Sequence, residues 1–331
     1  MAILVTGAAG FIGYHVASRL LTEGESVIGI DELNAYYDPQ LKRDRLAALR
    51  ELGEDFIFHQ LDFADEESLE SALAGTDIDR IVHLGAQAGV RYSIDNPRAY
   101  VRANLAGHLN ILELARTRKV GHLVYASSSS VYGARAKQPS SLGDRVDHPI
   151  SLYAATKKAD ELMSETYAHL YRIPQTGLRF FTVYGPWGRP DMAIWKFTSA
   201  ILEGRPIDLY NHGDMSRDFT FIDDVADAVT AILARPPADD AEEKPGGSIA
   251  PHAIYNLGNN RPERLSHLID LIESACGREA EKILLPMQPG DVPATYANID
   301  AAARDHDYRP ATPLAEGIPE FVNWYRSYKH L

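Results

Sequence analysis

The stretch Thr6-Gly7-Ala8-Ala9-Gly10-Phe11-Ile12-Gly13 decides the fold, because it follows a short apolar run over 2–5 and opens a helical pattern over 11–23. Glycine is required where a turn needs a positive φ, where backbone approaches a pyrophosphate, and where a helix packs closely on a strand. The N-terminus of the following helix offers free N–H groups and a positive dipole end to phosphates. Strand, glycines and helix together predict the first unit of a dinucleotide-binding fold.

Two aspartates extend this prediction to the rest of the cofactor. Asp31 ends the second predicted strand, where a carboxylate hydrogen-bonds a ribose 2′-hydroxyl and repels a 2′-phosphate, so we expect NAD in preference to NADP. Asp62 follows the third predicted strand. Its carboxylate is either a contact for the adenine amino group or the N-cap of the next helix.

Short apolar runs alternate with longer helical patterns up to about residue 180. The predicted strands lie at 2–5, 27–30, 56–58, 81–84, 123–126 and 176–178. The predicted helices lie at 11–23, 39–52, 65–74, 97–118 and 151–172. Such alternation is typical of right-handed βαβ units and of a parallel sheet covered by helices on both faces. We therefore expect an α/β chain with a Rossmann-type doubly wound parallel sheet.

The pattern changes in the second half of the chain, where the periodic pieces become shorter and Pro and Gly more frequent. We expect one domain over 1–180 and a smaller C-terminal α/β substrate-binding domain over 181–331. The chain is expected to return to the first domain near 217–235 and 253–257. The segment 236–251 is acidic and rich in Gly and Pro, which predicts a surface loop.

Composition excludes several classes of function. The 331 residues include 33 Lys and Arg against 46 Asp and Glu, a net charge of −13 that disfavours nucleic-acid and anionic-membrane partners. No uninterrupted apolar run reaches the ~18 residues of a membrane span. The single cysteine, Cys276, excludes an internal disulfide and indicates a cytoplasmic protein. The histidines lack metal-binding spacing, so we expect no metal site.

Tyr153 and Lys157 place a phenol and an ammonium four residues apart, on one face of a predicted helix. A phenol with a pKa near 10 is a poor base at neutral pH, but a nearby cation favours the phenolate and lowers that pKa. The position of the pair, in the helix after the fifth predicted strand, makes it a candidate acid/base site.

These features together resemble the extended short-chain dehydrogenase/reductase family of nucleotide-sugar enzymes. The glycine triplet, the serines before Val131-Tyr132-Gly133, and Tyr153-x-x-x-Lys157 carry the resemblance, which extends over nearly the whole chain. It implies that Tyr153 is the acid/base, that Lys157 binds the nicotinamide ribose and lowers the tyrosine pKa, and that Ser128 assists proton transfer. It also implies tightly bound NAD, regenerated each cycle, contacted by Gly7, Gly10, Phe11, Ile12, Gly13, Asp31, Asp62, Phe63, Leu84, Ala86, Tyr153 and Lys157.

Ser129 and Ser130 distinguish between reactions within this family. Dehydratases carry an Asp-Glu pair at these positions, because elimination of water needs an acid and a base there. Decarboxylases that form UDP-xylose carry Glu at the second position. Serine at both positions therefore favours epimerisation.

The segment Thr182-Val183-Tyr184-Gly185-Pro186-Trp187-Gly188-Arg189-Pro190-Asp191-Met192 is similar to the UDP-glucuronate 4-epimerases, as are 88–93 and 34–38. A hexuronate carries a carboxylate that must be paired on burial, and Arg189 is its expected partner. The resemblance implies a UDP-hexuronate as the substrate. The substrate-binding residues it implies are Ser129, Ser130, Thr182, Arg189, Arg217 (phosphate), Asp291 (uridine ribose), Gln87 and Arg91. For Arg91 a contact with the protein's own acidic surface is the alternative.

Two alternatives to a UDP-glucuronate 4-epimerase stay open at this point. One is a UDP-glucose 4-epimerase or a UDP-glucuronate decarboxylase of the same family. The other is a non-catalytic NAD-binding sensor, although such proteins typically lose the Tyr or the Lys that this chain keeps at 153 and 157.

The predicted helices 97–118 and 151–172 carry apolar stripes, which we expect first of all to face the sheet. The resemblance implies a second possibility, a homodimer formed through an intermolecular four-helix bundle. In that case Leu162, Met163 and Leu170 face a partner subunit. The stripe residues are Val101, Leu105, Leu109 and Leu112 on the first helix, and Leu152, Ala155, Ala159, Leu162, Met163 and Leu170 on the second.

Overall fold

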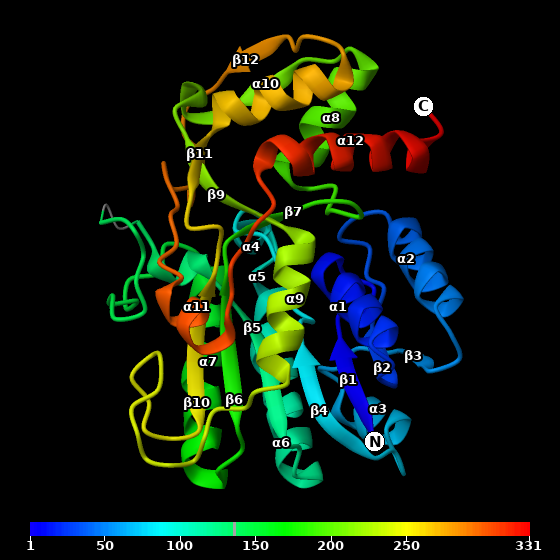
Figure 1. Cartoon of the computed structure of the whole chain (residues 1–331), viewed down its shortest axis with the longest axis vertical. Helices are drawn as coiled ribbons and strands as arrows, with labels where there is room; N and C mark the ends of the chain where they lie inside the picture. The colour runs from blue at the N-terminus through cyan, green and yellow to red at the C-terminus, as the bar shows by residue number, and fades with distance from the viewer. Residues whose placement is uncertain (135–136) are drawn as a thin grey trace.

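A seven-stranded parallel sheet forms the centre of the computed structural model, which describes residues 1–134 and 137–331 (Figure 1). The strand order is β10-β6-β5-β4-β1-β2-β3, so the chain reverses direction of travel across the sheet at β1. In register, Val5 lies between Gly29 and Val82. The strands are β1 (Ala2–Thr6), β2 (Val27–Asp31), β3 (Phe56–Gln60), β4 (Ile78–His83), β5 (His122–Ser128), β6 (Gln175–Phe180) and β10 (His252–Leu257).

Helices cover both faces of this sheet, which confirms the Rossmann-type fold expected from the sequence. On one face α1 (Phe11–Thr22) packs against α9 (Ile222–Leu233), with α2 (Pro39–Glu51) beside α1 (Figure 1). On the other face α6 (Gly107–Arg118) packs against α7 (Leu152–Tyr171), with α3 (Glu66–Ala72) nearby. In open sheets of this kind, ligands bind at the carboxyl ends of the strands where the order reverses.

The turn after β1 requires its glycines. Gly7 has φ +70°, and a Cβ there would lie 2.7 Å from the backbone nitrogen of Gly85. A Cβ on Gly13 would collide with the carbonyl oxygen of Gly7. The close approach of strand, turn and helix therefore depends on the absence of side chains, as the glycine spacing predicts.

The C-terminal half builds a smaller unit above the carboxyl ends of the strands and returns to the main sheet through α9 and β10 (Figure 1). Residues 236–251 form neither helix nor strand. The elements of the smaller unit are β7 (Thr182–Tyr184), α8 (Ala193–Glu203), β8 (Ile207–Leu209), η3 (Tyr210–Gly213), β9 (Ser216–Phe221), β11 (Pro262–Arg264), α10 (Leu265–Cys276), β12 (Lys282–Leu284) and α12 (Leu314–Lys329). Between the last two, α11 (Asp300–His306) returns to pack on β10 and α9.

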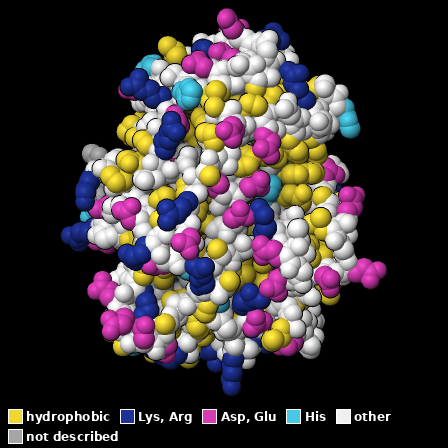
Figure 2. All heavy atoms as spheres, in the orientation of Figure 1, with side chains coloured by type: hydrophobic (Ala, Val, Ile, Leu, Met, Phe, Trp, Pro, Cys, Tyr) yellow, Lys and Arg dark blue, Asp and Glu magenta, His cyan; other side chains and the backbone are white. Residues whose placement is uncertain are grey.

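An aromatic seam joins the smaller unit to the first helices. Trp187 packs against Tyr14 and Trp324, each at a ring-centroid distance of 5.3 Å, and Trp324 stacks on Tyr328 at 5.2 Å. Figure 2 shows hydrophobic side chains gathered where α12 passes over α1 and α2, while acidic and basic side chains are interspersed over the rest of this face. Within the described ranges, no helix is long and apolar enough to cross a membrane.

The predicted helix 97–118 is divided by a π-helical segment. It consists of α5 (Pro97–Tyr100), the π segment η1 (Val101–Ala106) and α6, preceded by the short α4 (Tyr92–Asp95). The π segment buries Asn104, whose amide bonds both backbone groups of Gln87 and the hydroxyl of Thr156. The widened turn thereby ties the loop after β4 to the start of α7.

The expectation that both apolar stripes face the sheet is wrong for several of their residues. Val101 and Leu109 are 48% and 41% exposed, and Leu162 and Leu170 are 58% and 61% exposed, whereas Leu112 is buried. The sheet-facing side of α7 is largely polar instead, and its buried residues are Ala154, Thr156, Lys157, Asp160, Glu161, Ser164 and Ala168. Leu162 and Leu170 therefore lie on an outer face of the molecule, whereas Met163, also expected to face either the sheet or a partner, packs against the buried cluster that contains Leu112.

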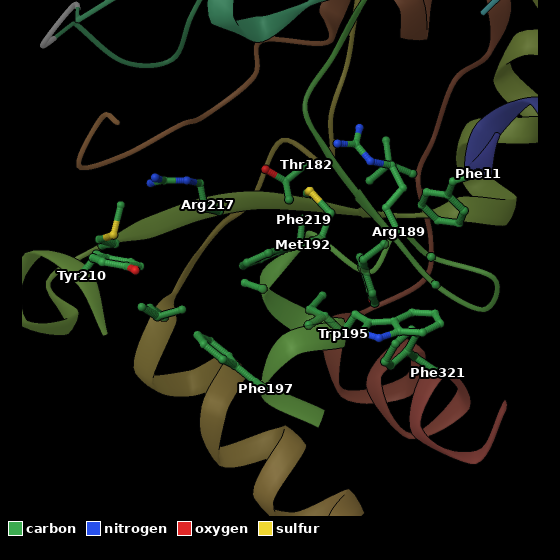
Figure 3. A pocket seen from close by; sticks show the side chains of 18 of the residues that line it. Phe11, Thr182, Arg189, Met192, Trp195, Phe197, Tyr210, Arg217, Phe219 and Phe321 are labelled. Carbon is green, nitrogen blue, oxygen red and sulfur yellow. The ribbon is translucent and has the colours of Figure 1, made fainter. Parts of the chain in front are cut away.

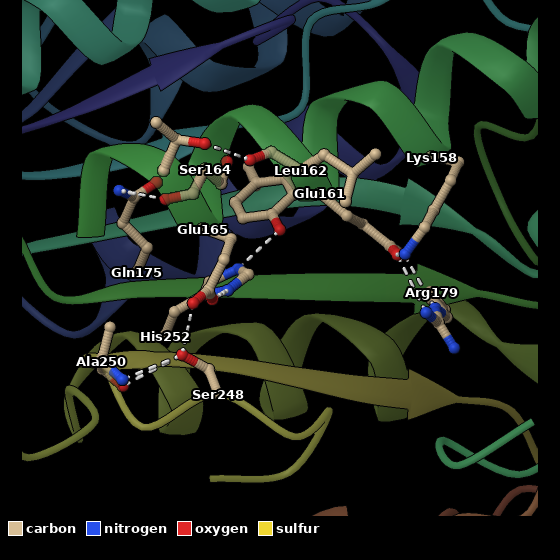
Figure 4. A network of polar contacts seen from close by, with 12 residues as sticks. Lys158, Glu161, Leu162, Ser164, Glu165, Gln175, Arg179, Ser248, Ala250 and His252 are labelled. Atoms are coloured by element: carbon tan, nitrogen blue, oxygen red, sulfur yellow. Dashed lines mark hydrogen bonds and ion pairs between the residues drawn. The ribbon is translucent and has the colours of Figure 1, made fainter. Parts of the chain in front are cut away.

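Internal pairs explain how α7 buries polar side chains. Glu161 accepts two hydrogen bonds from Arg179 on β6, at 2.7 and 2.9 Å, and one from Ser127 on β5 at 2.7 Å (Figure 4). Burial alone raises the pKa of Glu161, but the hydrogen bonds and charge of Arg179 outweigh it and lower the pKa to about 2. A charged, fully paired carboxylate thus fastens α7 to the sheet.

A second polar chain fastens the far end of α7. The hydroxyl of Tyr125 lies 2.8 Å from His252 Nε2, and His252 Nδ1 lies 2.7 Å from Glu165 on α7. Glu165 also accepts from Ser248, which connects the loop 236–251 to this helix (Figure 4).

Candidate active site

A cavity opens at the carboxyl ends of the strands, where β1 and β4 separate the two halves of the sheet. The twelve residues that the sequence assigns to the cofactor all line this cavity: Gly7, Gly10, Phe11, Ile12, Gly13, Asp31, Asp62, Phe63, Leu84, Ala86, Tyr153 and Lys157. They come from distant parts of the chain, so the topology brings together what the sequence shows only as separate motifs.

The residues present fit a dinucleotide. The backbone of Gly7 and Gly10 lines the cavity without side chains, at the start of α1, where N–H groups and the helix dipole favour a pyrophosphate. Asp31 is buried at the end of β2, where its Oδ1 accepts the N–H of Leu33 at 2.8 Å. A carboxylate so placed can accept from ribose hydroxyls.

Lys42 is a residue of this site that sequence reasoning missed. Its Nζ lies 3.7 Å from Asp31 Oδ1 and donates to Asn34 at 3.0 Å, and both Lys42 and Asn34 line the cofactor cavity. A buried cation beside the carboxylate reduces the repulsion that Asp31 alone would exert on a 2′-phosphate. No spacing signal marked it, because Lys42 belongs to α2 and reaches Asp31 only through the packing of that helix.

The structure separates the two interpretations of Asp62. The N-cap of α3 is Asp65, whose side chain accepts the N–H of Ser68, so the helix-cap interpretation of Asp62 is wrong. Asp62 instead accepts from the backbone of Ala64 at 2.9 Å and from Arg102 at 2.7 Å, on the wall of the cofactor cavity.

Tyr153, Lys157 and Ser128 converge at the boundary between this cavity and a second one. Tyr153 lies in the first turn of α7, which Ser151 caps by accepting the N–H of Ala154. Tyr153 and Ser128 line both cavities, while Lys157 lines the cofactor cavity. Ser128 ends β5, and its hydroxyl accepts the N–H of Ser130 at 3.1 Å. A group at this boundary can contact a cofactor on one side and a substrate on the other.

Lys157 is held by two buried acceptors. Its Nζ donates to the carbonyl of Ala126 at 2.9 Å and to Asp160 at 3.1 Å. Burial raises the pKa of Asp160 to about 6, although the charge of Lys157 opposes that rise. Asp160 is a second residue that sequence reasoning missed, and its spacing of three from Lys157 on one helix was the available signal.

The second cavity, of about 900 Å³, lies between the sheet and the C-terminal unit. Seven of the eight predicted substrate residues line it: Ser129, Ser130, Thr182, Arg189, Arg217, Asp291 and Arg91. Gln87 is the exception, because it is buried on the cofactor side, and the structure does not bring it to the substrate cavity.

The two ends of this cavity differ chemically. Figure 3 shows an adjoining, more apolar pocket that shares Arg217 and Tyr210 with this cavity at one end and Arg189 toward the other. At the first end Arg91 donates to Asp291 at 2.8 Å and lies over the ring of Tyr210, 4.6 Å from its centroid. Burial lowers the pKa of Arg217 from its ordinary value, while the Asp291 charge opposes that shift. Cations and an aromatic ring at one end suit a nucleoside diphosphate.

Arg189 lines the cofactor cavity as well as the substrate cavity. It is not free, because its Nε and Nη2 donate to the two carboxylate oxygens of Asp191 at 3.0 and 2.6 Å. Tyr36 donates to the same carboxylate at 3.1 Å. Tyr36 and Asp191 were quoted above only as parts of similar segments, and the sequence assigned neither a role.

No group of three or more His, Cys, Asp or Glu side chains is placed to hold a metal ion among residues 1–134 and 137–331.

Comparison with known proteins agrees with this geometry. The profile of the NAD dependent epimerase/dehydratase family matches residues 3–258. A probable UDP-glucuronate 4-epimerase of Rhizobium meliloti is 48% identical over 332 residues, covering 98% of this chain and 97% of that protein.

Two solved structures are similar over almost the full length. The UDP-glucuronic acid 4-epimerase of Bacillus cereus, in complex with UDP-glucuronic acid and NAD, has a TM-score of 0.87 at 32% identity, covering 99% of this chain and 100% of that one. The UDP-glucose 4-epimerase of Thermotoga maritima with UDP-glucose has a TM-score of 0.85 at 27% identity, with the same coverage.

Proposed function

The chain belongs to the NAD dependent epimerase/dehydratase family, and from that premise we propose that it is an NAD-dependent epimerase that inverts C4 of a UDP-hexuronate, interconverting UDP-glucuronate and UDP-galacturonate. One observation carries the choice of reaction. The acid/base group Tyr153 stands where the cofactor and substrate cavities meet, and the neighbouring positions 129 and 130 are serines rather than acids. The site can move a proton at a sugar hydroxyl but offers no acid and base pair for elimination.

The reaction uses the residues at this boundary in sequence. NAD, when held in the cavity lined by Gly7, Gly10 and Asp31, would supply a hydride acceptor for C4 that can return the hydride to the opposite face of the ketone. Tyr153, as the phenolate, takes the proton of the 4-hydroxyl directly or through Ser128 and later gives it back. Lys157, held by Ala126 and Asp160 in a fixed position beside the cofactor cavity, is assigned to the nicotinamide ribose.

The hexuronate carboxylate is assigned to the end of the substrate cavity near Tyr153. Arg189 lies there with the hydroxyls of Ser129, Ser130 and Thr182. A buried carboxylate needs a charge partner and hydrogen-bond donors, and these residues supply both. The diphosphate and uridine are assigned to the other end, to Arg217, Arg91 and Asp291.

We test this function by incubating the purified protein with UDP-glucuronate and, separately, with UDP-glucose. NMR then identifies the products. We expect UDP-galacturonate from the first and far slower conversion of the second. Faster conversion of UDP-glucose would favour the UDP-glucose 4-epimerase alternative, and UDP-xylose as the main product would favour a decarboxylase. Retention of NAD without any conversion would favour a non-catalytic sensor.

We also propose that the protein is a homodimer, built from an intermolecular bundle of α7 and the α5–α6 region. The support is the outer apolar face formed by Val101, Leu109, Leu162 and Leu170, each at least 41% exposed on this chain. Apolar side chains at this density on adjacent helices are typical of a covered surface. A cytoplasmic location also remains part of this proposal, on the single, buried cysteine.

A further inference from the structure

We propose that Asp191 and Tyr36 are positioning residues for Arg189, which fix its guanidinium so that it pairs with the carboxylate of a bound hexuronate before and after the 4-ketone turns over. This inference rests on the proposed 4-epimerase function and assigns roles to two residues that the reaction itself does not require.

The Arg189–Asp191 pair fixes both the position and the plane of the guanidinium. Nε and Nη2 each donate to a different oxygen of Asp191, and such two-point pairing holds the planar group in one orientation. The side chains of Arg189 and Asp191 are only 22% and 26% exposed. This arrangement leaves Nη1 for a ligand, since no group in the described part of the chain accepts a hydrogen bond from it.

Tyr36 adds a third contact from a different part of the fold. It lies in the loop between β2 and α2, which borders the cofactor cavity, and donates to Asp191 across 155 residues of sequence. Burial, reinforced by the Asp191 charge, raises the pKa of Tyr36 to about 12, so the phenol stays a hydrogen-bond donor at every physiological pH. The hydrogen bond therefore ties the substrate side of the site to the cofactor side.

The loop that carries Arg189 is itself held by the first helices. Arg45 on α2 donates to the carbonyls of Trp187 and Gly188 at 2.5 and 3.3 Å, and His15 on α1 lies 3.0 Å from the carbonyl of Pro186. Trp187 has φ +60°, a left-handed conformation that costs energy for a non-glycine residue. Such a conformation persists only where the surroundings enforce it, which indicates that this loop is built to stay in place.

The ring of Tyr36 also connects Arg189 to the acid/base group. It packs on Tyr92 at a centroid distance of 4.8 Å, Tyr92 lies 6.3 Å from Tyr100, and Tyr100 lies 6.0 Å from Tyr153. Packed aromatic rings constrain one another's positions, because close-packed protein interiors have little free volume. The distance between Arg189 and Tyr153 is therefore set by packing on one side and by the Asp191 hydrogen bonds on the other.

A fixed guanidinium matters because the 4-keto hexuronate is a β-keto acid. If its C5–C6 bond aligns with the carbonyl π-system, that bond breaks, CO₂ leaves, and the electron pair passes to the enolate of C4. C5 then takes a proton, and the resulting 4-ketopentose accepts the hydride that had been taken from C4. Pairing of the carboxylate with this guanidinium, before and after the ketone turns over, keeps the C5–C6 bond out of this alignment.

Two variants test the inference. Tyr36→Phe keeps the ring against Tyr92 and removes the hydroxyl, and Asp191→Asn keeps the shape and removes the charge. With UDP-glucuronate we expect the ratio of UDP-pentose to UDP-galacturonate to rise roughly tenfold for Tyr36→Phe, the factor expected for one lost hydrogen bond to a charged group. A larger rise is expected for Asp191→Asn, because the amide keeps only one acceptor oxygen for Arg189 and carries no charge.

Tyr328→Phe is the matched control. It also removes a phenol that donates to a carboxylate, that of Asp44 at 2.6 Å, but neither residue lines the cofactor or the substrate cavity. Its product ratio should equal that of the unmutated protein, and melting temperatures establish that all variants fold.

A second measurement separates this inference from the proposed function. Calorimetry gives the affinity for UDP-glucuronate and for UDP-xylose, which lacks the carboxylate. Tyr36→Phe and Asp191→Asn should lower the affinity for UDP-glucuronate several-fold and leave the affinity for UDP-xylose unchanged. Unchanged product ratios together with unchanged affinities would overturn the inference even if the unmutated protein is an efficient epimerase. If the unmutated protein does not epimerise UDP-glucuronate, the proposed function fails, and the affinity difference alone decides the role of Tyr36 and Asp191. If it binds neither UDP-sugar, both are refuted.

Discussion

Leu162→Glu should convert the proposed dimer into a monomer without unfolding it. Leu162 lies on the outer face of α7 and is 58% exposed on this chain. Because it does not contribute to the core of the protomer, the free energy of unfolding should change by no more than about 0.5 kcal/mol. Any effect on the assembly therefore reports on the surface rather than on the fold.

The magnitude follows from that exposure. Full burial of a leucine stabilises by about 1.5–3 kcal/mol, so covering the exposed 58% of Leu162 is worth about 1–2 kcal/mol. In a two-fold symmetric interface the same residue counts on both protomers, which doubles the loss to about 2–4 kcal/mol. Burying two carboxylates without partners adds further cost. We expect the dissociation constant to rise at least about 10²-fold.

Light scattering coupled to size-exclusion chromatography, over a range of protein concentrations, measures the outcome. Leu284→Glu on β12 is the matched control, since Leu284 is 57% exposed but lies on the C-terminal unit, away from α7. The control should keep the mass of a dimer where Leu162→Glu gives that of a monomer. An unmutated protein that stays monomeric at micromolar concentration would refute the bundle, as would equal dissociation of both variants.

Three further outcomes are expected. Tyr153→Phe should lower kcat by roughly 10²–10⁴-fold, with UDP-sugar affinity in calorimetry little changed; a variant that keeps most of its rate would show that another group moves the proton. Asp31→Ala should weaken the binding of NAD in fluorescence titrations and reduce the difference in affinity between NAD and NADP. The reason is that Lys42, which lies 3.7 Å from Asp31, remains to pair with a 2′-phosphate. Equal affinities for NAD and NADP in the unmutated protein would contradict this. Glu161→Gln should lower the free energy of unfolding at pH 7 by about 3–5 kcal/mol, since it leaves Arg179 buried without its charge partner. The folded pKa of Glu161, about 2, lies below the ordinary 4.5, so its stabilisation is complete above pH 4.5 and is lost as the pH falls toward 2, and denaturant titrations of the variant should lack that loss.

The cofactor half of the site could be predicted from the sequence because its signals are local. Gly7 and Gly13 are required by the backbone geometry of one turn, and Asp31 by its place at the end of one strand. Tyr153 and Lys157 share a helix, so their spacing alone places them on one face. Each of these requirements is met within a few residues of chain, and a reader of the sequence can recognise it there.

Periodicity misled where the buried face of a helix is not apolar. The sheet-facing side of α7 carries Glu161, which hydrophobicity assigns to solvent, because Arg179 and Ser127 satisfy it from two strands. Leu162 and Leu170, which hydrophobicity assigns to the core, lie outside. An apolar stripe indicates that one face of a helix packs against another surface. It does not indicate whether that surface belongs to the same protomer or to a partner subunit.

The sequence by itself determined the fold class and the cofactor of this protein, and it placed the proposed acid/base pair, Tyr153 and Lys157, on one face of a helix. Only the tertiary structure decided how the substrate end is built: Tyr36 meets Asp191 across 155 residues, and Arg91 meets Asp291 across 200. The physical reason is that a charged side chain has no fixed partner until the fold places one. Turns and helices constrain residues close in sequence, whereas the Tyr36–Asp191 and Arg91–Asp291 contacts depend on how separate loops pack together.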